Sequence, residues 1–289
     1  MFELQRTVRF SLSRTGRPNA AQANDSGPLS GAADNGFSSF PAMRGLGRYY
    51  ELTVTCRGEA DAATGYFLNI KEIDIAVREC VLPFFQELIE GSTPESALPM
   101  GWVMQQAMDR VQPALGGVVA AVELALSPMV RIAIESHDMN RITLRQHYEF
   151  SAAHRLHVDE LSNAENRAVF GKCNNPGGHG HNYRLEVAVE KAITPDGHAP
   201  AVEALDRLVD KHVIDRLDHK HLNLDVPEFA ELNPSVEHIA QVTWGMLEEP
   251  VSRYDTEGSA RLVEVRVWET GKTACIYRGP AERVEAHQP

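Results

Sequence analysis

The clearest pattern in the chain is a strict alternation of apolar and polar residues that begins near position 183. Tyr183, Leu185, Val187 and Val189 fall on one side of this stretch, and charged residues occupy positions 184 and 186. A period of two is typical of a half-buried β-strand. The sequence therefore predicts a strand here, introduced by the segment GHGH.

An earlier segment repeats this strand. Residues 45–56 read GLGRYYELTVTC, and residues 178–189 read GHGHNYRLEVAV. Self-similarity at a fixed offset is a signature of repeated structural units. The shared residues of the first copy are Gly45, Gly47, Tyr50, Leu52 and Val54.

The repeat extends in both directions and predicts two units of the same design. Each half reads strand, strand, helical region, strand, strand, which favours antiparallel sheets in an α+β fold. We expect a domain at 1–138 and another at 139–289, with a long surface loop at 14–41. The predicted apolar helix stripes are Ile73, Val77, Val81 and Leu88 in the first half and Leu205, Val209 and Val213 in the second, where a later helix follows Pro234.

Composition narrows the class of protein. The formal net charge of −12 argues against a general nucleic-acid or membrane-surface binder, although a local basic pocket for an anionic small molecule remains compatible with it. The first residues lack the apolar stretch of a secretion signal, and no window has the length of a membrane span. The four cysteines show no close pairing. We therefore expect reduced thiols in a cytoplasmic protein.

Three histidines of the second half form a candidate metal site. His179 and His181 are two apart on the predicted strand, so their side chains share a face. His154 ends the preceding strand, and a hairpin-like pairing would bring it beside them. Three imidazoles around an open fourth position are typical of catalytic zinc. The alternative is a set of hydrogen-bonded structural histidines.

The first half argues against that alternative. It has Arg14, Leu46 and Arg48 at the matching positions, and His137 is its only histidine within the first 140 residues. Because the same strand pattern occurs without histidines, the strand itself does not require them. We therefore favour a metal site.

Other candidate residues lie around this strand. Cys173, in a polar turn-forming segment, is a candidate base or nucleophile, or else a small buried residue. Asp218 and His219 form an acid–imidazole pair suited to proton transfer, or else a solvated helix end. Glu269 points to the apolar side of its strand and needs a partner, either a ligand with paired N–H donors or an arginine. Glu237 lies in a first helical turn, where it would also complement the helix dipole.

The ordered motifs resemble one family. FSAAHR, CNNPGGHGHNY, LDHKHLNLDVP, PSVEHIA and WET are similar to motifs of the 6-pyruvoyltetrahydropterin synthases, a family that includes the 6-carboxytetrahydropterin synthases of queuosine and deazapurine biosynthesis. The resemblance covers nearly all of 142–279. It implies the tunnelling fold, in which four-stranded antiparallel sheets backed by two helices join between subunits into a β-barrel. Active sites then lie at interfaces of a homo-oligomer.

The resemblance also implies roles and a substrate. The substrate would be 7,8-dihydroneopterin triphosphate, and the reaction a zinc-dependent elimination of triphosphate that gives the pyruvoyl product. The five residues between Cys173 and His179 favour this branch over the 6-carboxy branch, which releases acetaldehyde. A pterin- or metal-binding module without turnover and a zinc hydrolase are the alternatives of other classes. The implied roles are Zn²⁺ binding by His154, His179 and His181, proton transfer by Cys173, Asp218 and His219, and pterin binding by Glu269 with help from Glu237.

This sequence departs from the family pattern at two places. Ala201 stands where the family has Asp or Asn, and His238 ends the motif that is usually Thr-x-Glu-Asn. A modified pterin is therefore an alternative substrate, with ring recognition that differs in detail. The triphosphate site is unassigned, with Lys172 and Arg167 as nearby basic candidates. The first half, with Pro128 expected at the place of Glu269, is interpreted as a degenerate scaffolding copy.

Overall fold

The structure is a computed structural model that describes residues 1–12, 48–94, 97–253 and 260–280. These residues form two compact units. Unit 1 comprises Met1–Thr143 and Ala192–Pro200, and unit 2 comprises Leu144–Lys191 and Ala201–Pro289. The loop predicted at 14–41 lies outside the described residues, and the division into 1–138 and 139–289 stays a prediction.

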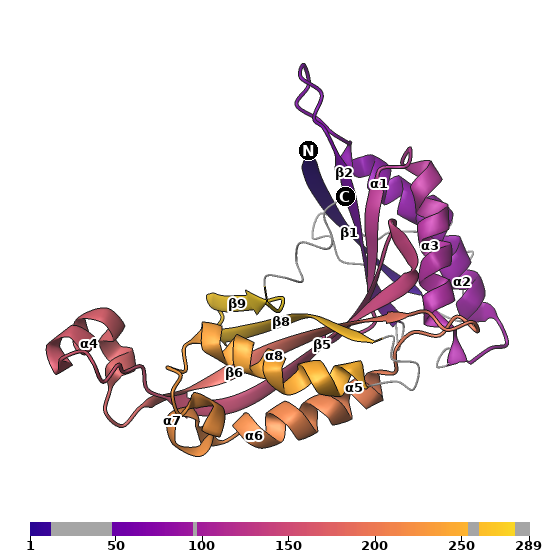
Figure 1. The fold of residues 1–289 in the computed structure, drawn as a ribbon. Coiled ribbons are helices and arrows are strands. Elements are labelled where there is room, and N and C mark those ends of the chain that lie inside the picture. The colour runs from indigo at the N-terminus through magenta and orange to yellow at the C-terminus, as the bar shows by residue number, and fades with distance from the viewer. Residues whose placement is uncertain (13–47, 95–96, 254–259, 281–289) are drawn as a thin grey trace, which may run out of the picture. The chain divides into compact units, whose positions relative to one another are not determined.

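Unit 1 is an antiparallel sheet with helices along one side, as Figure 1 shows. Its strand order is β1-β2-β3-β4, and each neighbouring pair is antiparallel. Helix α3 packs on β3 and β4. The elements are β1 Phe2–Leu12, β2 Arg48–Gly58, α1 Ile70–Ala76, the π-helix η3 Val77–Val81, α2 Leu82–Glu90, α3 Met100–Ala114, β3 Val119–Ala125 and β4 Val130–Glu135.

The predicted apolar stripe of the unit 1 helices is confirmed at its first three positions and wrong at its fourth. Asn69 caps α1 by accepting a hydrogen bond from Lys71 N, and Ile73, Val77 and Val81 are fully buried. Leu88 is only half-buried, and its neighbour Ile89 is buried instead. The π-turn of η3 inserts extra backbone per turn and shifts the apolar face, which a regular 3.6-residue period does not anticipate.

Unit 2 repeats this arrangement of sheet and helices. Its strand order is β5-β6-β8-β9, and a short strand, β7, pairs in parallel with β5. Strand β5 spans Asp138–His154, so it begins in unit 1. The other elements are α4 Asn163–Phe170, the 3-10 turn η5 Gly171–Asn174, β6 His179–Ala192, α5 Val202–Val209, the π-helix η6 Asp210–Ile214, α6 Asp215–Leu217, β7 Lys220–His221, α7 Leu222–Asp225, the 3-10 turn η7 Pro227–Phe229, α8 Val236–Ser252, β8 Arg261–Thr270 and β9 Thr273–Tyr277.

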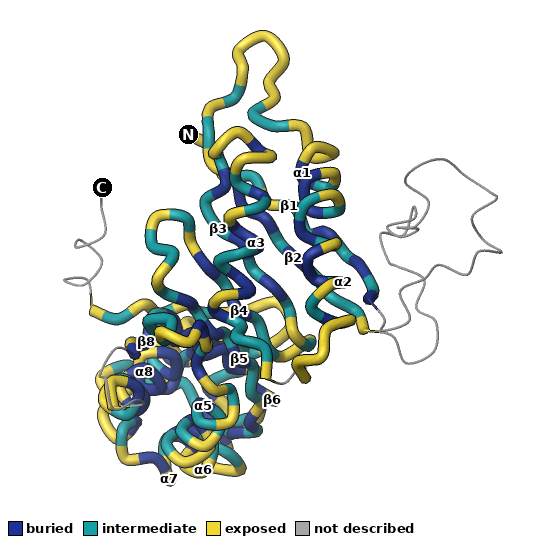
Figure 2. The backbone as a smooth tube through the Cα atoms, turned by 90° about the vertical axis from the view of Figure 1, so that its right-hand side faces the viewer, coloured by how far each residue is buried: buried dark blue, intermediate teal, exposed yellow. Residues whose placement is uncertain are grey.

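The helices of unit 2 cover the face of the sheet that carries its apolar side chains. Leu205, Val209 and Val213 are fully buried, as their spacing predicts, and α8 packs on β8 and β9. Buried backbone in Figure 2 runs along the strands and the helices that meet there. Between β5 and β6 the chain leaves the sheet and forms α4, which stands apart in Figure 1.

The two sheets share a register that the sequence does not display. In unit 1 Leu52 lies opposite Leu124, and in unit 2 Leu185 lies opposite Val267. The β2–β3 pair shifts register between Thr55 and Cys56, and the β6–β8 pair shifts between Ala188 and Val189. Both shifts keep the 133-residue offset of the repeat. Counted through these pairs, Leu126 and not Pro128 occupies the place of Glu269, so the expectation for Pro128 is wrong.

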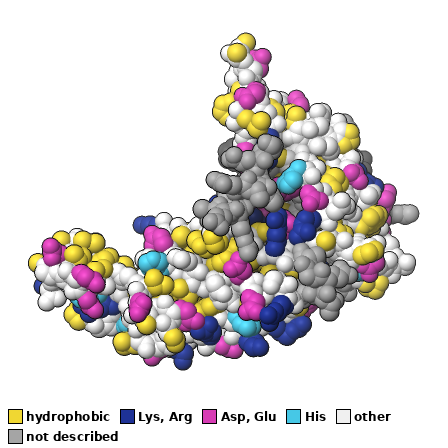
Figure 3. Space-filling view, viewed as in Figure 1, with side chains coloured by type: hydrophobic (Ala, Val, Ile, Leu, Met, Phe, Trp, Pro, Cys, Tyr) yellow, Lys and Arg dark blue, Asp and Glu magenta, His cyan; other side chains and the backbone are white. Residues whose placement is uncertain are grey.

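The opposite face of the unit 2 sheet is charged. Glu186 accepts a hydrogen bond from His147 at 2.6 Å, and buried Glu264 contacts Arg145 at 3.2 Å. Burial alone would raise the pKa of Glu186, but the His147 and Arg145 contacts outweigh it and lower this pKa. Acidic and basic side chains are interspersed on the surface in Figure 3. No helix within the described ranges is long and apolar enough to cross a membrane.

Candidate active site and metal centre

Three histidines meet where β5 ends and β6 begins. His179 and His181 are alternate residues of β6, so their side chains lie on the same face of the strand. His154, the last residue of β5, is fully buried. Its ring centroid lies 4.5 Å from that of His179 and 5.3 Å from that of His181. One ring nitrogen of each histidine lies within 4.8 Å of the others.

The hydrogen bonds of these rings leave nitrogen lone pairs without partners. His154 Nδ1 lies 2.6 Å from the carbonyl oxygen of Pro234. Since a carbonyl only accepts, Nδ1 carries the proton and Nε2 presents a lone pair, 3.2 Å from His179 Nε2. His179 Nδ1 and His181 Nε2 are buried without a hydrogen-bond partner. A backbone carbonyl that fixes the tautomer of a ligating histidine is typical of metal sites, so the donor set fits a zinc ion.

Burial keeps the imidazoles in the form that binds metals. It is the main cause that lowers the pKa of His154 and of His179, and the neighbouring rings lower both further. A histidine whose pKa is lowered stays neutral into weakly acidic solution. The cluster is therefore prepared to bind a cation near neutral pH.

A carboxylate completes the cluster. Glu269 Oε1 lies 3.4 Å from His154 Nε2 and 3.7 Å from His181 Nε2. Glu269 belongs to β8, where the register places it two residues beyond Val267. The side chain is 19% exposed, so one part of it faces the histidines and another remains open to a ligand.

Cys173 lies in the 3-10 turn η5, close enough to Glu269 for that charge to act on it. Burial first, and the charge of Glu269 second, raise the pKa of the Cys173 thiol. The expectation that Cys173 is a thiolate thus depends on a cation that offsets Glu269. The turn is held by a hydrogen bond from Leu156 N to the carbonyl oxygen of Cys173, at 2.9 Å.

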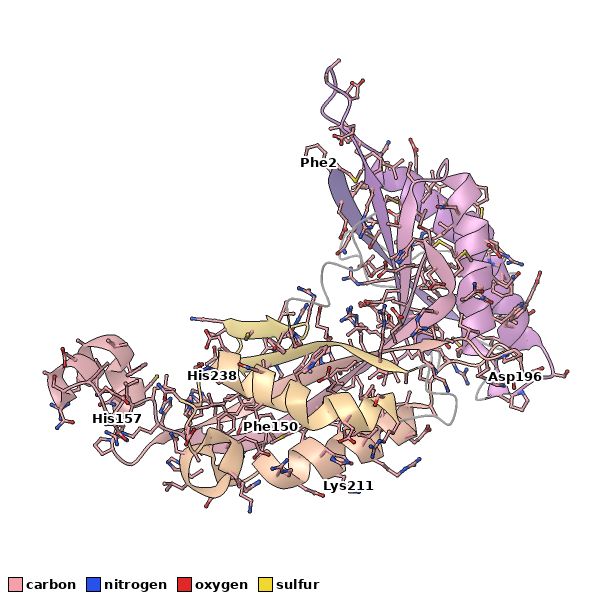
Figure 4. All side chains as sticks on the ribbon, viewed as in Figure 1. Phe2, Phe150, His157, Asp196, Lys211 and His238 are labelled. Carbon is pink, nitrogen blue, oxygen red and sulfur yellow. The ribbon has the colours of Figure 1, made fainter. Side chains whose placement is uncertain are left out.

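A polar network supports this turn. Buried Asn174 donates to the carbonyl of Leu156 at 2.8 Å and lies 2.9 Å from His157 Nδ1. Arg155 contacts the same imidazole nitrogen at 3.1 Å. His157 marks the start of the excursion that carries α4 in Figure 4. The position of Cys173 is therefore fixed by side chains on both sides of that excursion.

The Asp218–His219 pair lies apart from this cluster. Asp218 Oδ2 accepts a hydrogen bond from His219 Nδ1 at 2.7 Å, and Asp218 Oδ1 accepts from Ser151 N at 2.7 Å. The Ser151 N–H is the main cause that lowers the pKa of Asp218, which stays ionised. The imidazole of His219 is 83% exposed, and its backbone has φ 55°. Within the described parts of the chain, neither residue hydrogen-bonds to the histidine cluster, Cys173 or Glu269.

An open cavity borders both the pair and the cluster. Ser151 and Asn182 hydrogen-bond to each other at 2.8 Å and line this cavity together with His219. His181, a member of the histidine cluster, belongs to the same lining. The pair and the cluster therefore border one cavity, although no hydrogen bond joins them among the described residues.

Sequence comparisons identify relatives of the second half of this chain. The model of the family described as 6-pyruvoyl tetrahydropterin synthase matches residues 143–280. A 6-pyruvoyl tetrahydrobiopterin synthase of Poecilia reticulata is 40% identical over 131 residues, which are 45% of this chain and 85% of that protein. The Homo sapiens enzyme of the same name is 39% identical over 133 residues, 45% of this chain and 86% of its own length. The chain belongs to the 6-pyruvoyl tetrahydropterin synthase family.

A solved structure gives a similar match. The Caenorhabditis elegans 6-pyruvoyl tetrahydropterin synthase is 35% identical, covers 48% of this chain and 96% of its own, and has a TM-score of 0.44. The family match leaves residues 1–142 outside. All the candidate site residues lie inside it.

Glu237, the second carboxylate expected to bind the pterin, lies in the first turn of α8. Its hydrogen bond with Ser235 lowers its pKa, and its charge, after burial, raises the pKa of Cys275. Glu237 is exposed, and no hydrogen bond joins it to the histidine cluster in the part of the chain that is described. Its pterin role in this family member stays a prediction.

Two contributors to the site were not found from the sequence. Tyr183 stacks on Phe150 with ring centroids 5.0 Å apart and makes a T-shaped contact with His181, and its buried hydroxyl has no partner. Its shared parity with His179 and His181 was the available signal. The carbonyl of Pro234, which orients the His154 ring, gave no signal in the sequence, because main-chain groups carry no residue-specific pattern.

Proposed function

We propose that this chain is a zinc-dependent lyase that converts 7,8-dihydroneopterin triphosphate into 6-pyruvoyl tetrahydropterin. The observation that carries the proposal is the cluster of three imidazoles beside Glu269 and Cys173, in which His179 and His181 each have a buried nitrogen without a hydrogen-bond partner. The names of the relatives support the same activity. When bound by His154, His179 and His181, zinc supplies the Lewis acidity that makes a carbon-bound proton of the substrate side chain easier to remove.

The protein side chains divide the remaining work. Glu269 accepts N–H groups of the pterin ring and orients it. Cys173 removes the side-chain proton, and the bond from carbon to the triphosphate oxygen breaks with its electron pair on that oxygen. His219, oriented by Asp218 through Nδ1, exchanges protons through its exposed Nε2 during the tautomerisation that follows.

We further propose that the Asp218–His219 pair of one copy serves the metal cluster of another copy. The exposure of its imidazole, and the lack of a hydrogen bond from the pair to the cluster among the described residues, support this arrangement. The chain then acts as a homo-oligomer with active sites at subunit interfaces. Sheets of adjacent copies would close into the barrel of the tunnelling fold, which also removes open sheet edges.

Unit 1 is proposed to be a duplicated unit without metal ligands that has a scaffolding role. The equal strand order, the equally placed register shifts and the matching π-helices η3 and η6 support duplication. Arg48 occupies the place of His181, and Leu126 that of Glu269. On this proposal, the degenerate domain is 1–138 and the catalytic domain is 139–289.

The activity is tested by incubating the zinc-loaded chain with 7,8-dihydroneopterin triphosphate and identifying products by mass. Release of triphosphate with the pyruvoyl product supports the proposal. The 6-carboxy product with acetaldehyde would assign the other branch of the family. Unchanged substrate, with zinc bound, would leave a binding module and contradict the proposal.

The shared site is tested by mixing two inactive variants, Cys173→Ala and His219→Ala, under conditions of subunit exchange. If one copy supplies Cys173 and another His219, random mixing restores about a quarter of the wild-type sites. If both residues act within one chain, each chain has a broken site and the mixture stays inactive. Cys173→Ala mixed with wild-type protein that has been inactivated by zinc removal serves as the control.

A further inference from the structure

The open cavity beside Asp218 and His219 is lined by hydrogen-bonding side chains and one lysine. It has a volume of about 540 Å³, and its lining includes Ser151, Asn182, His219, Lys220 and His221, together with His181 of the histidine cluster. No Asp or Glu belongs to the described lining. This is a local exception in a chain with a formal net charge of −12.

The donors of this cavity are oriented and unsatisfied. Ser151 Oγ donates to Asn182 Oδ1 at 2.8 Å, which leaves the amide Nδ2 of Asn182 free to donate into the cavity. Lys220 is exposed and forms no ion pair with any residue that the structure describes. His219 Nδ1 is taken by Asp218, so its Nε2 is the nitrogen available to a ligand.

The backbone holds Lys220 in place. Strand β7 pairs in parallel with β5, with Lys220 opposite Ala152 and His221 opposite Ala153. His221 N donates to Asp225 Oδ2 at 2.7 Å. A cation that extends from a short, paired strand is better positioned than one on a free loop, because less backbone entropy is lost when a ligand binds.

We infer that this cavity binds the polyphosphate tail of the substrate and the triphosphate that leaves. The inference rests on the proposed function and extends it to a subsite that the sequence left unassigned. The lining offers the charge of Lys220 and N–H donors, which suit phosphate oxygens, and it contains no Phe, Tyr or Trp on which a pterin ring would stack. Occupation of this cavity places the leaving oxygen beside His219, the group able to protonate it.

The inference replaces the earlier basic candidates. Arg167 lies in α4 and Lys172 in η5, and neither belongs to the lining of the cavity. Lys220 is expected to set the affinity for phosphate, and the histidine cluster to set the affinity for the rest of the substrate. The two contributions are separable by a ligand that carries phosphate alone.

The test titrates inorganic tripolyphosphate into the zinc-loaded full chain by calorimetry. Lys220→Ala is expected to weaken binding roughly 10- to 100-fold, the usual scale for one charge-assisted contact, and Lys220→Arg much less. Asn182→Asp, which places a negative charge in the cavity, is expected to weaken it as well. Lys211→Ala is the matched control, since Lys211 is an exposed lysine of η6 that Figure 4 shows on the helical layer.

Zinc content is measured after each titration, because tripolyphosphate chelates metal ions. If tripolyphosphate bound only through the zinc ion, Lys220→Ala would not change its affinity. An unchanged affinity in that variant therefore overturns the inference. Equal weakening by Lys172→Ala also overturns it. Turnover adds a second readout: Lys220→Ala should raise KM for the pterin triphosphate more than it lowers kcat. Tripolyphosphate binding that depends on Lys220 in a chain without turnover would support the subsite and contradict the proposed activity.

Discussion

Corresponding pairs of strands in the two units end with different residues. In unit 1 Phe10 stacks on Tyr50 with ring centroids 5.7 Å apart, and in unit 2 Phe150 stacks on Tyr183 at 5.0 Å. Two residues before Tyr183 lies His181, whereas two residues before Tyr50 lies Arg48. The aromatic pair and the sheet register therefore do not depend on metal ligands, and the ligands occupy positions that the fold leaves free to vary.

The cavities at these strand ends differ in chemistry as well. Unit 1 has a cavity of about 450 Å³ whose lining is mainly apolar and includes Leu12, Leu124 and Leu126. Unit 2 has imidazoles and the carboxylate of Glu269 at the corresponding end. Buried polar groups without partners cost stability, and His179 Nδ1 and His181 Nε2 are such groups at this end of unit 2. A bound ligand would offset this cost.

The largest expected effect comes from exchanging the residues that distinguish the two strand ends. His181→Arg, which gives unit 2 the residue of unit 1, should lower zinc from about one ion per chain to none and abolish turnover, because two imidazoles beside a cation do not hold zinc. Metal analysis and activity assays measure both effects. Circular dichroism checks that the variant folds.

The reciprocal variant, Arg48→His, serves as the control. It should leave zinc at about one ion per chain, since unit 1 lacks the other ligands. A second zinc ion in this variant, or zinc retained by His181→Arg, would show that the strand ends differ less than their residues indicate.

A large effect is also expected at the thiol of Cys173, which lies beside the histidine cluster of unit 2. Cys173→Ala should reduce turnover by roughly two to four orders of magnitude, the usual scale for a lost acid–base group, while zinc and fold are kept. Cys80→Ala, in the π-helix of unit 1, is the matched control and should retain activity. Near-normal turnover of Cys173→Ala would remove the thiol from the mechanism.

The sequence predicted the strands and the histidine cluster because both depend on local periodicity. Alternation alone placed His179 and His181 on one face, and the end of the preceding strand placed His154 beside them. The apolar stripe at Leu205, Val209 and Val213 was likewise local. These predictions required no knowledge of which distant residues meet.

Features set by long-range pairing could not be predicted in this way. The pairing of β7 with β5 brings Lys220 and His221 beside Ala152 and Ala153, and the local pattern of neither segment indicates it. The register of β3 puts Leu126 where Pro128 was expected. The tertiary position of Pro234, whose carbonyl orients His154, also depends on how α8 packs and not on any pattern in its own segment.

A moderate effect is expected at Glu269, whose place in unit 1 is taken by Leu126. Glu269→Gln should weaken pterin binding by about 1–3 kcal/mol, because the amide replaces one acceptor with a donor opposite the N–H groups of the ring. Zinc content should persist. Binding of a pterin product, measured by fluorescence, and metal analysis test the two expectations.

Glu269 lies 3.4 Å from His154 Nε2, close enough to contribute to the metal site. The metal analysis therefore decides between a role of Glu269 in zinc binding and a role in pterin binding. Loss of zinc with pterin affinity unchanged would assign Glu269 to the metal and not to the ring. Leu126→Gln, the corresponding change in unit 1, should alter neither quantity.

The smallest expected effect is a difference between the units in acid stability of the metal-free chain. His154 is fully buried, and burial lowers its pKa below the ordinary 6.5. In the unfolded chain this histidine takes up a proton as pH falls through 6.5, and in the folded unit it does not. Stability of unit 2 therefore decreases as pH falls below that value, by at most about 1.4 kcal/mol per pH unit for one proton. Unit 1 has no fully buried histidine in its described part.

Denaturant unfolding between pH 7.5 and 5.5 measures this difference, with Trp102→Phe so that fluorescence reports only Trp244 and Trp268 of unit 2. The unfolding midpoint should fall with pH in that background and respond less in His154→Gln, whose amide still donates to the carbonyl of Pro234. The lowered pKa values of Asp218 and Glu186 do not interfere, because carboxylates with lowered pKa values lose their stabilising contribution only below about pH 4. An equal pH response with and without His154→Gln would show that His154 is not the proton acceptor. The buried histidine cluster would then not distinguish the acid stability of the two units.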